Sequence, residues 1–128
     1  GISEKITFHG WMERENMRQL YRDSDVFVFP SRFEGMPNVV LEALGSGLPV
    51  LGTRIAGTEE LVQDGKNGYL IEVDDVPALA DRLARVINNR DLRLRMGRNA
   101  RFFMEERWSW AIRAKQLDEM VEEILTRR

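Results

Sequence analysis

The 128-residue chain contains no cysteine and a single histidine, His9. Without cysteine it has no disulfide bond, no thiolate nucleophile and no cysteine-based metal site. His9 has no evident acid–base partner in the sequence, so we interpret it as a structural or surface residue. No apolar run approaches the roughly 20 residues of a membrane-spanning helix, and the first residues lack the apolar segment of a secretory signal. These absences predict a cytoplasmic protein.

A large excess of charge of either sign is also absent. The formal net charge is -2 at pH 7, which gives no general signal for nucleic-acid binding. The exception is local, because residues 82–104 contain seven arginines against one acidic residue, Asp91. Such runs are usually solvated helix faces. We favour that interpretation, or contact with another domain, over a peripheral membrane surface that binds anionic lipid.

Short apolar segments alternate with helical ones along the chain. Strands are expected at 6–8, 26–29, 50–53 and 69–71, and helices at 13–22, 37–44 and 58–63. Three further helices are expected toward the C-terminus, with N-caps at Asp74 or Asp75, at Asp91 and at Ser109. Alternating strands and helices imply right-handed crossovers and a parallel sheet. The sequence predicts one α/β domain: a three-layer Rossmann-like parallel sheet of about four strands, with helices on both faces and extra C-terminal helices.

The most informative segment holds two glutamates eight positions apart, Glu34 and Glu42, on either side of a Gly-x-Pro-Asn turn. For an arbitrary pair of glutamates, an exposed loop residue and a surface ion pair would be the default interpretation. Here the segment follows the expected strand 26–29, and parallel α/β sheets bind their ligands at the carboxyl ends of the strands. We therefore favour a binding site.

The start of the helix after the turn suits an anion. The backbone N–H groups of Asn38, Val39 and Val40 lie at the positive end of the helix dipole, where a pyrophosphate can bind. Glu42 lies four residues after Asn38 and so shares its helix face. Its carboxylate can accept hydrogen bonds from two hydroxyls at once, as a ribose diol requires.

The residues before the helix suit a sugar carried by that phosphate. Glu34 precedes the turn, on the opposite side of the anion, and its carboxylate could accept hydrogen bonds from sugar hydroxyls. Gly35 allows the backbone to come close to a ligand, and Pro37, after Met36, stiffens the turn. The whole segment predicts a site for a nucleoside diphosphate with polyols at both ends.

Residues 33–42 resemble the Glu-x7-Glu motif of retaining glycosyltransferases of family 4, which have the two-domain GT-B fold. The resemblance covers nearly the whole chain and is carried by residues 25–31, 42–50, 57–60, 64–70 and 109–110. Residues 57–60 resemble a Gly-Gly-x-Pro-Glu turn of that family. This chain departs from the turn at two positions, with Ala56 in place of the first glycine and Glu59 in place of the proline.

The resemblance implies roles for the segment. Glu34 would be the catalytic residue that contacts the donor hexose and stabilises charge near the anomeric centre. The backbone of Asn38 to Val40 would hold the diphosphate, Glu42 would hold the ribose, and Gly35, Met36 and Pro37 would complete the contacts to the donor. The resemblance implies a nucleoside-diphosphate sugar as donor, a glycan or lipid-linked acceptor, and no metal ion or other cofactor.

The resemblance also implies that residues 1–128 form a partial donor-binding domain. The N-terminal acceptor domain of the family and the first two strands of its C-terminal domain have no counterpart in this sequence, so we expect the chain alone to transfer no sugar. Two alternatives stay open: a non-catalytic flavodoxin-like binding module, and an engineered minimal scaffold that keeps the motif without the function.

We also expect self-association, as a homodimer. An incomplete sheet exposes unpaired edge groups, and the final helix carries an apolar stripe whose partner domain is missing. The stripe consists of Ile112, Leu117, Val121 and Ile124. Pairing of 6–8 with 26–29 would indicate a sheet rearranged relative to the family, whereas an unpaired 6–8 would favour exchange between chains.

Overall fold

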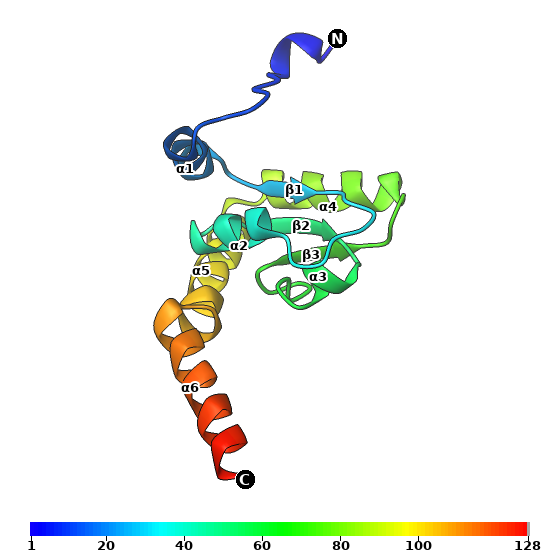
Figure 1. Cartoon of the computed structure of the whole chain (residues 1–128). Coiled ribbons are helices and arrows are strands. Elements are labelled where there is room, and N and C mark those ends of the chain that lie inside the picture. The colour runs from blue at the N-terminus through cyan, green and yellow to red at the C-terminus, as the bar shows by residue number, and fades with distance from the viewer. Residues whose placement is uncertain (128) are drawn as a thin grey trace.

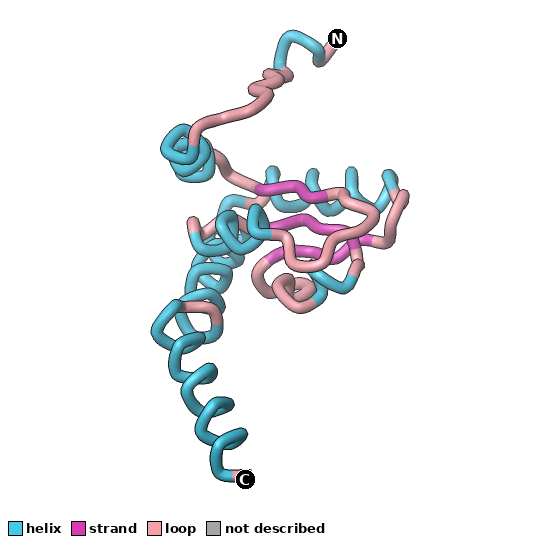
Figure 2. Tube along the Cα trace, viewed as in Figure 1, coloured by secondary structure: helices cyan, strands magenta, loops and turns pink. Residues whose placement is uncertain are grey.

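The computed structural model describes residues 1–127, and Figures 1 and 2 show the course of the chain. A short 3-10 helix, η1 (Ser3–Lys5), is followed by α1 (Arg14–Asp23), β1 (Phe27–Phe29), α2 (Asn38–Gly45), β2 (Val50–Thr53), α3 (Ala56–Glu59), β3 (Gly68–Ile71), α4 (Val76–Asn88), α5 (Arg90–Arg107) and α6 (Trp110–Thr126). Strands and helices alternate through the middle of the chain, and three successive helices close it.

The three strands form one parallel sheet in the order β1-β2-β3. In its register Val28 pairs with Leu51, and Leu51 pairs with Tyr69. All four residues of the central strand β2 are buried, whereas β1 is only half-buried. The expected α/β fold with a parallel sheet is confirmed.

The sheet has three strands rather than about four, because residues 6–8 do not form one. They belong to an exposed N-terminal arm that leads away from the sheet (Figure 1). Phe8 is 93% exposed. The prediction of a strand at 6–8 is wrong, because within residues 1–127 no strand lies beside this segment. An extended segment without such a neighbour leaves its ladder hydrogen bonds unmade. Pairing between 6–8 and β1 does not occur.

The core lies on both faces of the sheet. Val50 packs with Val40 and Leu44 of α2 on one face, whereas the next residue of β2, Leu51, packs with Val86 of α4 on the other. The reversal between adjacent residues follows from the strand period of two. Helix α5 contributes to both clusters, through Ala100 to the first and through Leu92 and Met96 to the second. The result is the three-layer arrangement that the sequence predicts.

The C-terminal helices begin close to where the sequence places them. Asp75 caps α4 by accepting a hydrogen bond from the N–H of Ala78 at 3.0 Å, and Ser109 caps α6 by accepting one from Ile112 at 3.4 Å. The cap of α5 is Asn89 rather than Asp91, because the backbone is extended at Asn89 and the helix starts directly after it. Asp91 instead lies in the first turn, where a negative charge is favourable to the helix dipole.

Several arginines of the basic segment make contacts within the chain. Arg93 donates hydrogen bonds to the carbonyl oxygens of Val86 and Ile87, at 3.2 and 2.8 Å. Arg82 lies over the ring of Tyr69, 4.9 Å from its centroid. Part of the positive charge of 82–104 therefore supports the packing of α4 and α5. Among the helices of residues 1–127, none is long and apolar enough to cross a membrane.

The last helix is largely exposed, and only Ile112, at its start, is half-buried. None of its residues is buried, and Leu117, Val121 and Ile124 of the predicted stripe are all exposed. In Figure 1, α6 (red) and the N-terminal arm (blue) extend from the sheet toward opposite ends of the molecule. The described part of the chain therefore leaves the apolar stripe of α6 without cover.

Candidate functional site

The loop between β1 and α2 leaves the carboxyl edge of the sheet and is tied to its neighbours. At the end of β2, the hydroxyl of Thr53 donates a hydrogen bond to the carbonyl oxygen of Ser31. The hydroxyl of Ser31 lies 3.4 Å from Oε1 of Glu34 and 3.2 Å from the carbonyl oxygen of Phe33, and it can donate to either. Glu34 is consequently held beside the end of the sheet.

A second contact presses α3 against the same loop. A Cβ added to Gly57 would lie 2.4 Å from the carbonyl oxygen of Gly35 and 2.8 Å from Cδ of Pro37. Only a residue without a side chain fits there, because a Cβ at these distances would overlap backbone atoms. The neighbouring Thr58, fully buried, donates its hydroxyl hydrogen bond to the carbonyl oxygen of Thr53. Sequence reasoning treated Gly57 only as part of a family resemblance, and its packing against residues 35–37 is a finding of the structure.

The N-terminus of α2 lies at the end of this loop. Pro37 is its N-cap, one residue outside the helix, so the expected start at 37 shifts by one position. The N–H of Val40 donates to the carbonyl oxygen of Pro37 at 3.0 Å. The N–H groups of Asn38 and Val39 have no acceptor among residues 1–127. These two groups are the first-turn donors that a bound anion could accept from.

One face of α2 is buried and the other is open. Val40, Ala43 and Leu44 are fully buried, whereas Asn38 and Glu42 are exposed. This division follows from helical spacing, since residues i and i+4 share a face. The sequence-based placement of Glu42 on the face of Asn38 therefore agrees with the structure.

Glu42 is in contact with a residue that sequence reasoning did not include in the site. The hydroxyl of Tyr21, at the end of α1, donates a hydrogen bond to Oε2 of Glu42 at 3.1 Å. Tyr21 is buried. Burial of the phenol, followed by the charge of Glu42 and the hydrogen bond to it, raises the pKa of Tyr21 to about 12. The available signal was a tyrosine on the inward face of an amphipathic helix, because a buried phenol normally has a hydrogen-bond partner.

Two cavities adjoin at Glu42 and share its side chain and that of Arg14. The smaller, of about 230 Å³, is lined by Arg14, Arg18, Tyr21, Glu42 and Ser46. The larger, of about 570 Å³, is lined by Arg14, Asn38, Leu41, Glu42, Met104, Trp108, Trp110 and Arg113. A volume of several hundred Å³ is in the range of small-molecule sites. Glu34 lines neither cavity. The two carboxylates therefore lie in different surroundings near the N-terminus of α2.

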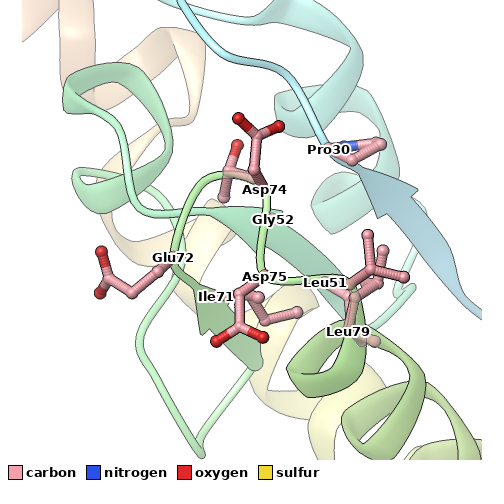
Figure 3. A pocket seen from close by; sticks show the side chains of 10 residues that line it. Pro30, Leu51, Gly52, Ile71, Glu72, Asp74, Asp75 and Leu79 are labelled. Carbon is pink, nitrogen blue, oxygen red and sulfur yellow. The ribbon is translucent and has the colours of Figure 1, made fainter.

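A further cavity lies over the carboxyl ends of the strands (Figure 3). Its volume is about 100 Å³, which is small for a nucleotide. Figure 3 shows the carboxylates of Glu72, Asp74 and Asp75 pointing in different directions around it. Asp74 forms an ion pair with Arg32 of the β1–α2 loop at 2.9 Å. We interpret this cavity as a gap left where that loop packs against the turn after β3.

A parallel α/β sheet flanked by helices on both faces defines a Rossmann-like fold. Comparison with known families identifies the lineage: the model described as "Glycosyl transferases group 1" matches residues 1–103, and the chain belongs to this family. The predicted resemblance to a glycosyltransferase domain is thereby confirmed.

Known proteins match the chain over nearly its whole length. It is 36% identical over 126 residues to a D-inositol 3-phosphate glycosyltransferase of Corynebacterium urealyticum, covering 98% of this chain and 30% of that protein. Among solved structures it resembles S. aureus TarM, determined as a mutant in complex with fondaparinux, alpha-GlcNAc-glycerol and UDP, with a TM-score of 0.82, 28% identity and coverage of 91% and 24%.

A sucrose-phosphate synthase from Thermosynechococcus elongatus shares the fold with a TM-score of 0.88, at 24% identity and coverage of 99% and 32%. The chain spans 21% to 30% of the length of curated relatives that it matches.

Proposed function

We propose that the chain is the donor-binding part of a glycosyltransferase that takes a hexose from a nucleoside-diphosphate sugar with retention of anomeric configuration. The observation that carries the proposal is the pair Glu34 and Glu42 on either side of the open N-terminus of α2. Family membership supports the class of reaction. The UDP in the TarM complex supports a nucleotide as ligand.

The diphosphate would bind at the start of α2. The N–H groups of Asn38 and Val39 have no acceptor within the described residues 1–127. That of Val40 adds to the positive field although it already donates to Pro37. These dipoles would stabilise the negative charge of the diphosphate. We therefore propose that donor binding needs neither a metal ion nor another cofactor.

The two carboxylates would divide the rest of the donor between them. Glu42 would accept hydrogen bonds from the ribose diol, since it shares the open face of α2 with Asn38. Glu34 would contact the hexose and stabilise charge that develops near the anomeric centre. Gly35, Met36 and Pro37 would line the path between hexose and phosphate.

Sugar transfer would need more than residues 1–128. We propose an acceptor domain outside this sequence, a glycan or lipid-linked acceptor, and a cytoplasmic location. Donor affinity of the chain alone would be in roughly the millimolar range, because phosphate contacts from such additional parts would be missing. We also propose that the isolated chain forms a homodimer.

Amide NMR during titration with UDP and UDP-glucose tests the proposal. We expect saturable shifts of the amides of residues 34–36 and 38–42, while those of residues 117–126 of α6, which line neither cavity at Glu42, stay in place as an internal control. Saturation elsewhere with unchanged 34–42 amides would refute the site. A chain that binds neither ligand at millimolar concentration would instead fit a scaffold that keeps the motif without the function.

A further inference from the structure

We infer that Tyr21 is a positioning residue that orients Glu42 toward the ribose of the donor. The inference rests on the proposed function, because it assigns a task to Tyr21 only if Glu42 binds a diol. It concerns a residue 21 positions before Glu42, on another helix, that the Glu-x7-Glu motif does not include.

The hydroxyl of Tyr21 is fixed in space by the core. Its side chain is 4% exposed and belongs to the cluster that packs α2 against the sheet. Its ring lies against that of Phe27 in β1, with 5.9 Å between the centroids. A hydroxyl held by a packed aromatic ring has little freedom to move, so its 3.1 Å hydrogen bond to Oε2 specifies one orientation of the Glu42 carboxylate.

Without this bond the Glu42 side chain would be free to choose among rotamers. Glu42 is exposed on the surface of α2. Arg14 and Arg18 line the same cavity, but within residues 1–127 neither forms an ion pair with Glu42, and Arg18 instead pairs with Glu15 at 3.4 Å. Tyr21 is the side chain of the described residues that hydrogen-bonds this carboxylate.

The bond leaves the carboxylate able to bind a diol. An ionised carboxylate has about four lone-pair sites, and Tyr21 occupies one of them on Oε2. Oε1 accepts no hydrogen bond from residues 1–127. A tyrosine phenol is protonated at neutral pH, so Tyr21 is a donor to Glu42 there. A correctly oriented acceptor loses less side-chain entropy when the ligand binds.

The chain offers a matched control, because it contains only two tyrosines. Tyr69 is also buried, on β3, and Arg82 lies over its ring. Its hydroxyl makes no hydrogen bond to residues 1–127 and lies outside both cavities at Glu42. Tyr21→Phe and Tyr69→Phe each remove one oxygen atom and keep the aromatic ring.

The experiment compares NMR titrations with UDP and with 2′,3′-dideoxy-UDP, which lacks the diol. We expect the parent chain to prefer UDP about tenfold, and Tyr21→Phe to reduce that preference by about three- to tenfold, the range of one hydrogen bond. Affinity for the dideoxy nucleotide should stay the same in Tyr21→Phe, and Tyr69→Phe should behave as the parent for both ligands. In a Glu42→Gln background, Tyr21→Phe should reduce the preference no further.

The outcomes separate the inference from the proposed function. A parent chain that binds the two nucleotides equally well would refute the ribose role of Glu42, and the inference with it. A parent that discriminates, with a Tyr21→Phe variant that discriminates equally, would overturn the inference alone. Equal weakening of both nucleotides by Tyr21→Phe would show a structural role and would also overturn it.

Discussion

Helices α2 and α6 differ in what covers their apolar faces. Helix α2 has 8 residues and buries Val40, Ala43 and Leu44 completely against the sheet and α5. Helix α6 has 17 residues and buries none. Both carry an apolar stripe at helical spacing. The comparison shows that an apolar stripe predicts a helix and identifies its apolar face. Whether that face is buried depends on another element of the fold that packs against it.

The largest expected difference between the two regions is in stability. Leu44 is fully buried in α2 and Leu117 is 61% exposed on α6. Leu44→Ala should lower the free energy of unfolding by about 2–5 kcal/mol because it leaves a cavity in the core. At protein concentrations where the chain is monomeric, Leu117→Ala should change it by no more than about 0.5 kcal/mol. Urea denaturation of the two variants measures the difference, and equal losses would contradict the assignment of α6 to an uncovered position.

The next prediction concerns the contact between α3 and the site loop. Gly57→Ala should destabilise the chain by about 1–3 kcal/mol, since the new Cβ would overlap the backbone of Gly35. Gly45→Ala is the matched control, because a Cβ there meets nothing within 4 Å. It should be neutral or stabilise the helix by up to about 1 kcal/mol. If both variants unfold at the same midpoint temperature as the parent chain, the loop at Gly35 can shift away from α3 at little cost, which would contradict the prediction.

Ligand binding should separate the two carboxylates of the site. Glu42→Ala should weaken UDP and UDP-glucose alike by about tenfold, because it removes the diol acceptor common to both. Glu34→Ala should weaken only UDP-glucose, and Glu119→Ala on the exposed α6 should weaken neither. NMR titration gives the three affinities. A Glu34→Ala variant that loses affinity for UDP itself would refute the division of roles.

The uncovered stripe of α6 should drive self-association of the isolated chain. Sedimentation at high concentration should show a species heavier than the 14.9 kDa monomer. Val121→Glu should shift the distribution toward monomer, since it places a charge in the middle of the stripe. Asp118→Glu, which keeps the charge on α6, should not. A parent chain that remains monomeric would remove α6 as a dimer contact.

The last prediction concerns the dependence of stability on alkaline pH. The pKa of Tyr21 is about 12 in the folded chain against an ordinary value of 10.0. Between these values the unfolded chain has lost the phenol proton and the folded chain keeps it, so stability falls as the pH rises. The fall should be smaller in Tyr21→Phe than in Tyr69→Phe. Denaturant midpoints measured from pH 9 to 12 would show it, and identical slopes would contradict it.

Most elements could be predicted because their signals are local. Strand β2 lies at 50–53 as expected, and the faces of α2 follow from its periodicity. The expected strand at 6–8 failed because an apolar alternation says nothing about whether a neighbouring strand is present. The cap of α5 is Asn89 rather than the predicted Asp91. The backbone is extended at Asn89, between the end of α4 and the start of α5, and this residue is therefore the cap.

The sequence by itself determined the class of fold, the strand–loop–helix unit and the shared face of Asn38 and Glu42, because each depends on residues within a few positions of one another. Only the tertiary structure decided that Tyr21 hydrogen-bonds Glu42 and that Gly57 packs closely against the backbone of Gly35. It also decided that α6 stays largely exposed. These contacts join residues about 20 positions apart, or require a surface that no local pattern describes. Their physical basis is packing, in which the shape of one element decides what another can touch.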